Sequence, residues 1–90
     1  MKKEINKYGT IFYYGDNGFI HREGGPAVEY TNGDKYWCKI GKFHREDGPA
    51  VERIYEDGSY YKEYWYDDKH YPNIKTDRYW KRFVKLLIFQ

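Results

Sequence analysis

The chain has 90 residues and a formal net charge of +2 at pH 7, a length that allows one small hydrophobic core and excludes a second domain. Aromatic residues make up 22% of the sequence, with 12 Tyr among them, and because each ring buries about 150–250 Å² a few rings can replace many aliphatic side chains. A single Cys excludes an internal disulfide bond, and no apolar stretch is long enough to cross a bilayer.

The N-terminal residues 1–4 are charged, and no apolar segment follows them. A secretion signal needs an apolar segment behind its charged start. The sequence therefore predicts an intracellular protein. Cys38 stands beside Trp37 in a strand-like pattern, and we expect it to be a packed side chain rather than a nucleophile.

A nine-residue phrase occurs twice, at residues 21–29 and at residues 44–52, and only its fourth position differs. A spacing of 23 residues is typical of a small supersecondary unit that stacks on copies of itself. Such a unit cannot bury its apolar face alone, so neighbouring units complete one another's core. We therefore interpret the chain as a short repeat array.

Two dipeptides in this array mark hairpin turns. Asn32-Gly33 and Asp57-Gly58 are typical of two-residue turns, because both residues tolerate positive φ. The two turns are 25 residues apart instead of 23, which predicts a small insertion at a bulge or loop of the second unit. One unit is expected to contain a strand, a turn, a second strand and a Gly-containing bend.

A third, degraded copy follows the second. Aromatic pairs at residues 13–14, 36–37 and 64–65 each precede a histidine, namely His21, His44 and His70. In the last hairpin, residues 60–66, aromatic side chains alternate onto both faces of the predicted sheet. A sheet with aromatic residues on both faces needs a further segment to cover one of them.

From Thr76 the apolar spacing becomes helical. Thr76 or Asp77 is a good N-cap, and the run to Phe89 contains neither Gly nor Pro. The sequence predicts an amphipathic helix over residues 76–89, which either caps the open sheet or docks into a partner. Its apolar stripe contains Trp80, Phe83, Val84 and Leu87, and its basic side contains Arg78, Lys81, Arg82 and Lys85.

The period, the Gly-x-x-His bend, the Asp-Gly turn and the Tyr-Trp strand together resemble a MORN-type repeat, in the variant form with His-Arg-Glu-Asp-Gly-Pro-Ala. The resemblance covers residues 10–71. Arg22 and Arg45 stand where the family usually has Gly after the histidine. The resemblance implies an extended antiparallel sheet that attaches to protein or lipid. We predict a mainly β fold, with an antiparallel meander of about six strands and one C-terminal helix, in a single domain over residues 1–90.

Charge is distributed unevenly along the chain. Residues 1–68 carry 10 basic and 13 acidic side chains, whereas residues 69–90 carry 6 basic side chains and one acidic side chain. A basic end is suited to phosphates or to anionic lipid. The acidic repeats argue against a broad nucleic-acid footprint, and a membrane surface stays an alternative partner.

The repeated His-Arg-Glu triplet has two interpretations. Three stacked histidines with Glu23 and Glu46 would suit a zinc ion. A residue that recurs in every unit, however, usually serves the fold of that unit. We interpret the triplets as structural and expect each Arg to pair with a Glu, and we predict no metal, no cofactor and no catalytic group. The structural residues are His21, Arg22, Glu23, His44, Arg45 and Glu46.

The sequence therefore favours a non-enzymatic protein-binding module. Variant repeats of this type occur in bacterial, phage and large-virus proteins, and that resemblance implies a small inhibitor of a bacterial defence protein, of the anti-CRISPR type, which occludes its partner in the bacterial cytoplasm. The alternative is an adaptor that uses the basic helix on lipid or nucleic acid. The expected contact surface combines the last hairpin with the helix: Tyr60, Tyr64, Trp65, Tyr66, Arg78, Lys81, Arg82 and Lys85.

Overall fold

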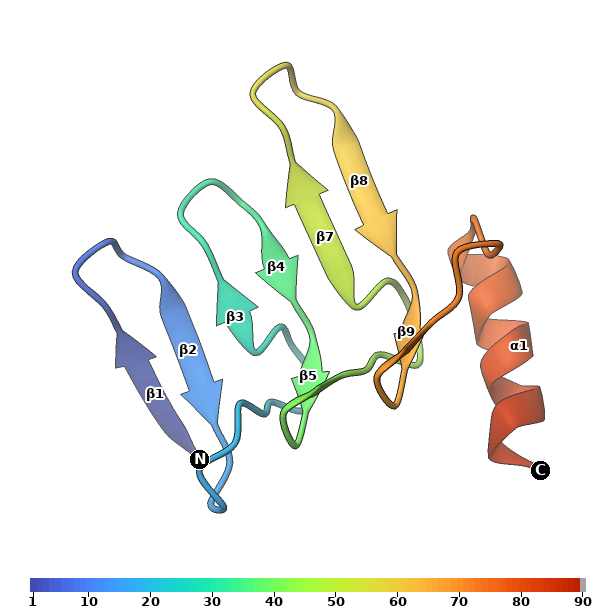
Figure 1. The fold of residues 1–90 in the computed structure, drawn as a ribbon, viewed down its shortest axis with the longest axis horizontal. Coiled ribbons are helices and arrows are strands. Elements are labelled where there is room, and N and C mark those ends of the chain that lie inside the picture. Colours follow the sequence, from blue (N-terminus) through green and yellow to red (C-terminus); the bar gives the residue numbers. More distant parts are fainter. Residues whose placement is uncertain (90) are drawn as a thin grey trace.

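The computed structural model describes residues 1–89 and shows a mainly β chain that ends in one helix (Figure 1). The predicted fold class is confirmed. Helix α1 spans Asp77–Ile88, within one residue of the expected bounds at each end. The strands of the described chain are β1 (Lys2–Ile5), β2 (Ile11–Tyr14), β3 (Val28–Glu29), β4 (Lys35–Tyr36), β5 (Cys38–Lys39), β6 (Lys42–Phe43), β7 (Val51–Ile54), β8 (Tyr60–Glu63), β9 (Trp65–Tyr66) and β10 (Lys69–His70).

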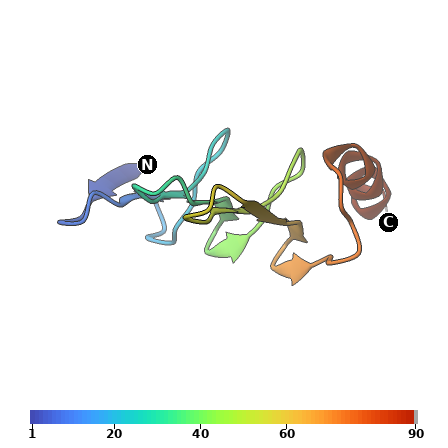
Figure 2. The same ribbon diagram turned by 90° about the horizontal axis from the view of Figure 1, so that it is seen from above.

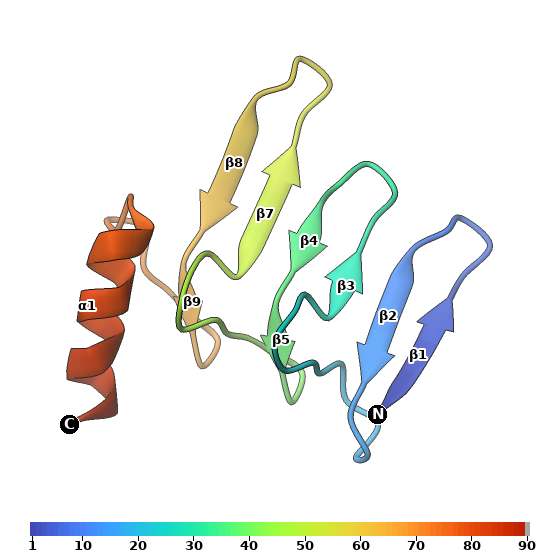
Figure 3. The ribbon, with the colours of Figure 1, turned by 180° about the vertical axis from the view of Figure 1, so that it is seen from behind.

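Six strands form one antiparallel meander in the order β1-β2-β3-β4-β7-β8, which confirms the predicted architecture. The other four form two small ribbons, β5 with β6 and β9 with β10. These lie at the base of the second hairpin (β3 and β4) and of the third hairpin (β7 and β8) (Figure 1). The molecule measures 41 × 38 × 17 Å, and most of its width is a single sheet (Figure 2). Seen from behind, the helix lies at the end of the sheet opposite to the first hairpin (Figure 3).

The repeats begin earlier than residue 10, because β1 and β2 already form a complete hairpin. Its turn is closed by the Asn6 N–H, which donates to the Thr10 carbonyl at 3.0 Å, and Gly9 has a φ of 86°. The second hairpin repeats this arrangement with Gly33 at 99°. The first hairpin was not predicted, because Tyr8-Gly9 is not a familiar turn dipeptide.

The turns at Gly33 and Gly58 differ from the predicted two-residue type. In each, only the Gly has a positive φ, and its N–H donates to a carbonyl three residues earlier, Tyr30 at 3.0 Å and Tyr55 at 2.9 Å. This is a three-residue loop in which a left-handed Gly follows a type I turn. The preceding Asn or Asp is not left-handed, so the expectation of two positive φ values was wrong.

Two-residue turns do occur, at the tips of the small ribbons. Ile40-Gly41 joins β5 to β6 with φ values of 50° and 74°, and Asp67-Asp68 joins β9 to β10 with 49° and 70°. Two successive positive φ values define a type I′ turn. Ile40 is a costly residue there, because a β-branched side chain strongly disfavours the left-handed region.

The predicted insertion lies in the strands of the third hairpin, not in a bulge or loop. Strands β3 and β4 share two residue pairs, whereas β7 and β8 share four. The additional pairs are Arg53 with Tyr61 and Ile54 with Tyr60. The third hairpin therefore projects further than the second one (Figure 1).

Strand register places the side chains on two faces. Tyr36 pairs with Val28 and Val51, so these three share one face, and the adjacent Trp37 points to the other. The loops formed by the repeated phrase, residues 21–27 and 44–50, rise with α1 on one side of the sheet (Figure 2). Because Arg45 lies over Trp37, we call that side the loop face and the other side the open face.

The core runs through the repeat units and ends under the helix. Thr76 caps α1, since its hydroxyl accepts from the Tyr79 N–H at 3.2 Å. The buried stripe of α1 packs against the third unit, and its Trp80 indole also donates to the Arg45 carbonyl in the second unit's loop, so the expected cover is limited to that end of the sheet. The buried apolar side chains of the described chain are Ala27, Val28, Cys38, Ala50, Val51, Tyr64, Trp80 and Val84.

Candidate functional site

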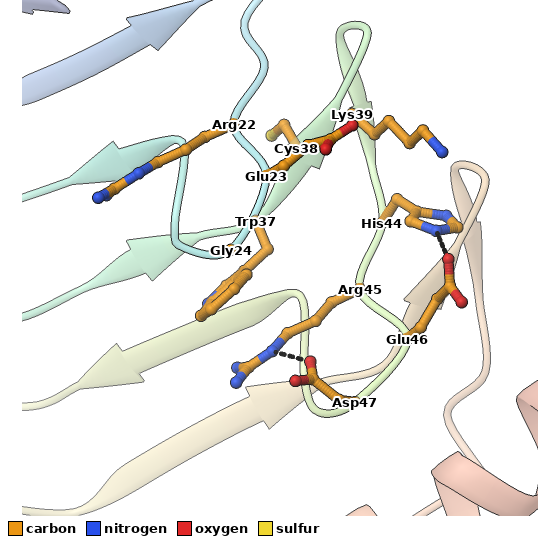
Figure 4. Close-up of a pocket in the computed structure, with 10 residues that line it drawn as sticks. All are labelled: Arg22, Glu23, Gly24, Trp37, Cys38, Lys39, His44, Arg45, Glu46 and Asp47. Atoms are coloured by element: carbon orange, nitrogen blue, oxygen red, sulfur yellow. Dashed lines mark hydrogen bonds and ion pairs between the residues drawn. The ribbon is translucent and has the colours of Figure 1, made fainter.

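The repeated phrase folds each arginine back over an aromatic ring. The Arg45 guanidinium carbon lies 3.6 Å from the centre of the Trp37 ring, and its Nη1 donates to the Pro49 carbonyl at 3.1 Å (Figure 4). Its Nε donates to Asp47 at 3.0 Å, and Nη1 lies 3.6 Å from Glu52. A stacked and hydrogen-bonded guanidinium is held more firmly than an exposed ion pair.

Arg22 repeats this geometry in the first unit. Its guanidinium carbon lies 4.0 Å from the centre of the Tyr13 ring, and Nη1 donates to the Pro26 carbonyl at 3.2 Å. The acidic partner is Glu29, at 3.9 Å. Both arginines therefore pair with the glutamate that ends the phrase rather than with the glutamate that follows them in the triplet.

The Gly at the fifth position of both copies of the phrase makes room for this arginine. A Cβ atom on Gly25 would lie 2.8 Å from the guanidinium carbon of Arg22, and one on Gly48 would lie 2.8 Å from that of Arg45. Neither Gly has a positive φ, so the requirement is steric rather than conformational. Each copy of the phrase thus places its guanidinium between the backbone of this Gly and an aromatic ring.

The histidines join one unit to the next. The Nδ1 atom of His21 accepts from the Ile40 N–H at 3.0 Å, and the Nδ1 atom of His44 accepts from the Asp67 N–H at 2.9 Å. Each donor is the first residue of a type I′ turn in the following unit. The triplet glutamates face the other ring nitrogen, with His21 Nε2 3.8 Å from Glu23 and His44 Nε2 3.2 Å from Glu46.

The third unit has Tyr71, not His70, at the histidine position. The Tyr71 N–H donates to the Tyr64 carbonyl at 2.9 Å, as the His44 N–H donates to Trp37 at 3.0 Å. His70 pairs with Trp65 in the ribbon, the place that Phe43 takes in the second unit. The predicted once-per-unit row of three histidines is therefore wrong, because the strand register makes Tyr71, and not the nearest histidine, equivalent to His44.

A shallow cavity of ≈ 370 Å³ lies between the two phrase loops (Figure 4). It contains side chains of both signs, and Arg45 and His44 pair there with Asp47 and Glu46. Burial, and secondly the Asp68 carboxylate, raises the pKa of the Cys38 thiol to about 11, so this thiol is neutral at pH 7. Within residues 1–89, no three His, Cys, Asp or Glu side chains gather closely enough to hold a metal ion.

The aromatic residues expected to bind a partner do not form one surface. Tyr64 is 1% exposed and lies under α1, where its hydroxyl donates to Asp77 at 2.6 Å. Trp65 packs against Phe43 toward the open face, at a ring separation of 5.1 Å. Tyr66 packs against the core under α1, so of the four predicted aromatic residues only Tyr60 is exposed. Tyr64 is removed from the candidate contact residues because the helix covers it.

The four predicted basic residues of α1 are all exposed on the side away from the core. Across the described residues, none of them lies within ion-pair distance of an acidic side chain; the helix's Asp77 lies 3.8 Å from Lys62 instead. Large apolar side chains stand next to these cations: Tyr79 is 70% exposed, Leu86 67% and Phe89 85%. These three were not predicted, because the helical spacing accounts for the apolar character of the helix by the buried stripe alone.

A second set of aromatic side chains lines the open face. The ring centres of Tyr30 and Tyr36 are 5.5 Å apart, those of Tyr36 and Phe43 5.7 Å, and Trp65 stacks on His70 at 4.9 Å. Such pairs stabilise a sheet by covering one another. Most of these rings are half-buried by their neighbours, which favours a structural role for this row.

No family model, no curated protein and no solved structure matches this chain. In the described part of the chain, the helix is too short and too polar to span a membrane.

Proposed function

We propose that this protein is a non-enzymatic protein-binding module that contacts its partner through the exposed side of α1. The observation that carries this proposal is the mixed composition of that side. A face that only keeps a protein soluble has no need of large exposed apolar side chains, and adjacent apolar and cationic groups are typical of interfaces. We call this surface the outer helix face; it consists of Arg78, Tyr79, Lys81, Arg82, Lys85, Leu86 and Phe89.

The spacing on this face fits insertion into a groove. Tyr79, Arg82, Leu86 and Phe89 stand at i, i+3, i+7 and i+10, which places them along one line of the helix surface. Helices that dock into grooves use anchors with this spacing. The fitting partner is therefore a protein whose apolar groove has an acidic rim, and its charge would mainly increase the association rate.

Lipid and nucleic acid fit this face less well. The main apolar stripe of α1 holds the helix on the protein, with Trp80 and Val84 buried, so that stripe is not free to enter a bilayer. The remaining residues 1–68 carry more acidic than basic side chains, which opposes a broad phosphate contact. The adaptor hypothesis becomes an outcome of the test below.

The finer proposal is a small inhibitor that occludes a bacterial defence protein, of the anti-CRISPR type, in the bacterial cytoplasm. Its support is the resemblance of the repeated phrase to variant repeats of phage and mobile-element proteins. Occlusion needs a firmly held binding surface and no chemistry. A helix that is fixed to the protein by the buried Trp80 side chain is consistent with a firmly held binding surface.

The test is a capture experiment with two variants of equal charge change. The protein is used to capture binding proteins from a bacterial lysate, and each captured protein is tested with Lys81→Glu/Arg82→Glu and with the control Lys7→Glu/Lys39→Glu. We expect the helix variant to fold normally and to lose binding at least tenfold, because each reversed charge opposes an acidic rim, while the control binds like wild type.

Equal binding by both folded variants would contradict the outer helix face as the contact surface. Two results together would favour the adaptor hypothesis instead. The protein would be retained on anionic vesicles or DNA with a steep dependence on salt, and the helix variant would capture the same proteins as wild type. Leu86→Ala tests the apolar part, and we expect weaker binding through faster dissociation at unchanged salt dependence.

A further inference from the structure

The two junctions between repeat units are each closed by one imidazole. Ile40 and Asp67 begin type I′ turns, and the backbone N–H of each donates to the Nδ1 atom of the preceding unit's histidine, at 3.0 and 2.9 Å. A ring nitrogen accepts a hydrogen bond only when it carries no proton. Both histidines are therefore neutral in this arrangement, with the proton on Nε2, which faces Glu23 or Glu46.

Protonation removes the acceptor. An imidazolium has N–H groups at both positions, so its Nδ1–H would point at the backbone N–H that it previously bound. The junction then loses a hydrogen bond and brings two donors together. The same chemistry would apply at both junctions, because the two sites repeat the geometry independently.

We propose that His21 and His44 are acid-released latches, each of which holds the turn of the next repeat unit and lets it go when its imidazole gains a proton. The latch at His44 also supports the packing of α1 against the third unit. The His44 ring lies 4.6 Å from the Tyr66 ring, and Tyr66 packs against the core beneath α1. This inference does not depend on the proposed function.

Charged groups surround both imidazoles and act in opposite directions. His44 faces Glu46, the turn residues Asp67 and Asp68, and Lys39 and Lys42; His21 faces Glu23, Asp16 and the terminal amine of Met1. The carboxylates attract an imidazolium, but Glu23 is 82% and Glu46 51% exposed, so water screens them. The neutral His44 ring already donates to Glu46 at 3.2 Å, and Glu23 lies 3.8 Å from His21 Nε2, so protonation adds little on that side and removes the acceptor on the other.

The test follows the two donor amides directly. Long-range ¹H–¹⁵N spectra identify the imidazole tautomer, and amide exchange of Ile40 and Asp67 is measured from pH 8 to pH 5 and corrected for the intrinsic rate. The imidazole ¹⁵N shifts recorded at each pH show whether each ring has gained its proton, so amide protection is compared with the protonation of the ring itself. We expect the Nε2–H tautomer at pH 8 and at least a tenfold loss of protection at both amides as the rings gain protons.

The matched variants are His44→Asn and His44→Gln. Asn carries an uncharged oxygen acceptor at the δ position, so protection of Asp67 is expected to become independent of pH while Ile40 still responds. Gln lacks an acceptor at that position, and Asp67 is expected to exchange rapidly at every pH. The Nδ1–H tautomer at pH 8, or full protection of both amides with protonated rings, would overturn the proposal.

Discussion

The second and third repeat units cover the same aromatic position by different means. In the second unit the guanidinium of Arg45 lies over Trp37, and the arginine comes from the same unit's loop. In the third unit Tyr64 takes the position of Trp37, and Trp80 from α1 packs against it at a ring separation of 5.4 Å. The Trp80 indole also donates to the Arg45 carbonyl at 2.7 Å, so the two residues that cover the aromatic positions are in direct contact.

This difference follows from what lies beyond each unit. The second unit is followed by a third. The Arg45 N–H in the loop of the second unit donates to the Trp65 carbonyl in the ribbon of the third unit at 3.2 Å. The third unit has no such successor in the described chain, and its loop is replaced by Pro72 and the segment leading to α1. An array needs a cap at its end, and here a helix with a buried apolar stripe supplies it.

Replacing Trp80 by Ala is expected to have the largest effect. Its side chain is fully buried, and removing a buried Trp costs about 3–5 kcal/mol of unfolding free energy. Urea denaturation monitored by circular dichroism measures this loss. Tyr79→Ala, on the exposed side of the same helix, is the control and is expected to cost under about 0.5 kcal/mol. Equal losses in the two variants would refute the capping role of α1.

Arg45→Ala is expected to cost about 2 kcal/mol, since a desolvated guanidinium on an aromatic ring and its hydrogen bonds are lost together. Arg22→Ala should cost less, because Arg22 makes longer contacts and is more exposed, 28% against 19%. Arg45→Lys should not restore the stability, as an ammonium cannot stack and bond in the same plane. Full stability of the Lys variant would show that only the charge matters.

Ile40→Asn is expected to have the smallest effect and the opposite sign. A left-handed, β-branched residue is strained, and Asn followed by Gly41 is the preferred type I′ sequence, so the variant should gain about 1 kcal/mol. Ile54→Asn is the control: Ile54 is similarly exposed but lies in strand β7, and the same change there should destabilise. Thermal unfolding compares the two, and a destabilised Ile40→Asn would mean that the turn is not strained.

The features that depend on local patterns were predictable from the sequence. The period and the helical spacing after Thr76 predicted the meander and α1 because each arises from residues close in the chain. The position predicted for His70 was wrong, since the register of β9 with β10 depends on the Asp67-Asp68 turn, where neither residue is a Gly. Tyr64 was expected to be exposed, but α1 packs against it and buries it. The strand pattern around Tyr64 does not predict this, because α1 comes from a later segment of the chain.

The candidate site divides in the same way. The exposed basic residues of α1 followed from helical spacing alone, whereas exposure of Tyr79 and Leu86 required knowledge of which side of the helix is buried. The pairing of Glu23 and Glu46 with histidine, not arginine, depends on how the phrase loop folds back. No spacing rule in the sequence contains that information.

The most direct test of the capped-array account is the exchange of the three Trp indole protons in one NMR experiment. The Trp80 indole is buried and donates to the Arg45 carbonyl at 2.7 Å, whereas the indoles of Trp37 and Trp65 donate to carboxylates on partly exposed residues at 3.2 and 3.0 Å. We predict that the Trp80 indole proton exchanges only on global unfolding, and that the other two exchange far faster. Exchange of Trp80 as fast as the others would show that α1 does not cap the third unit.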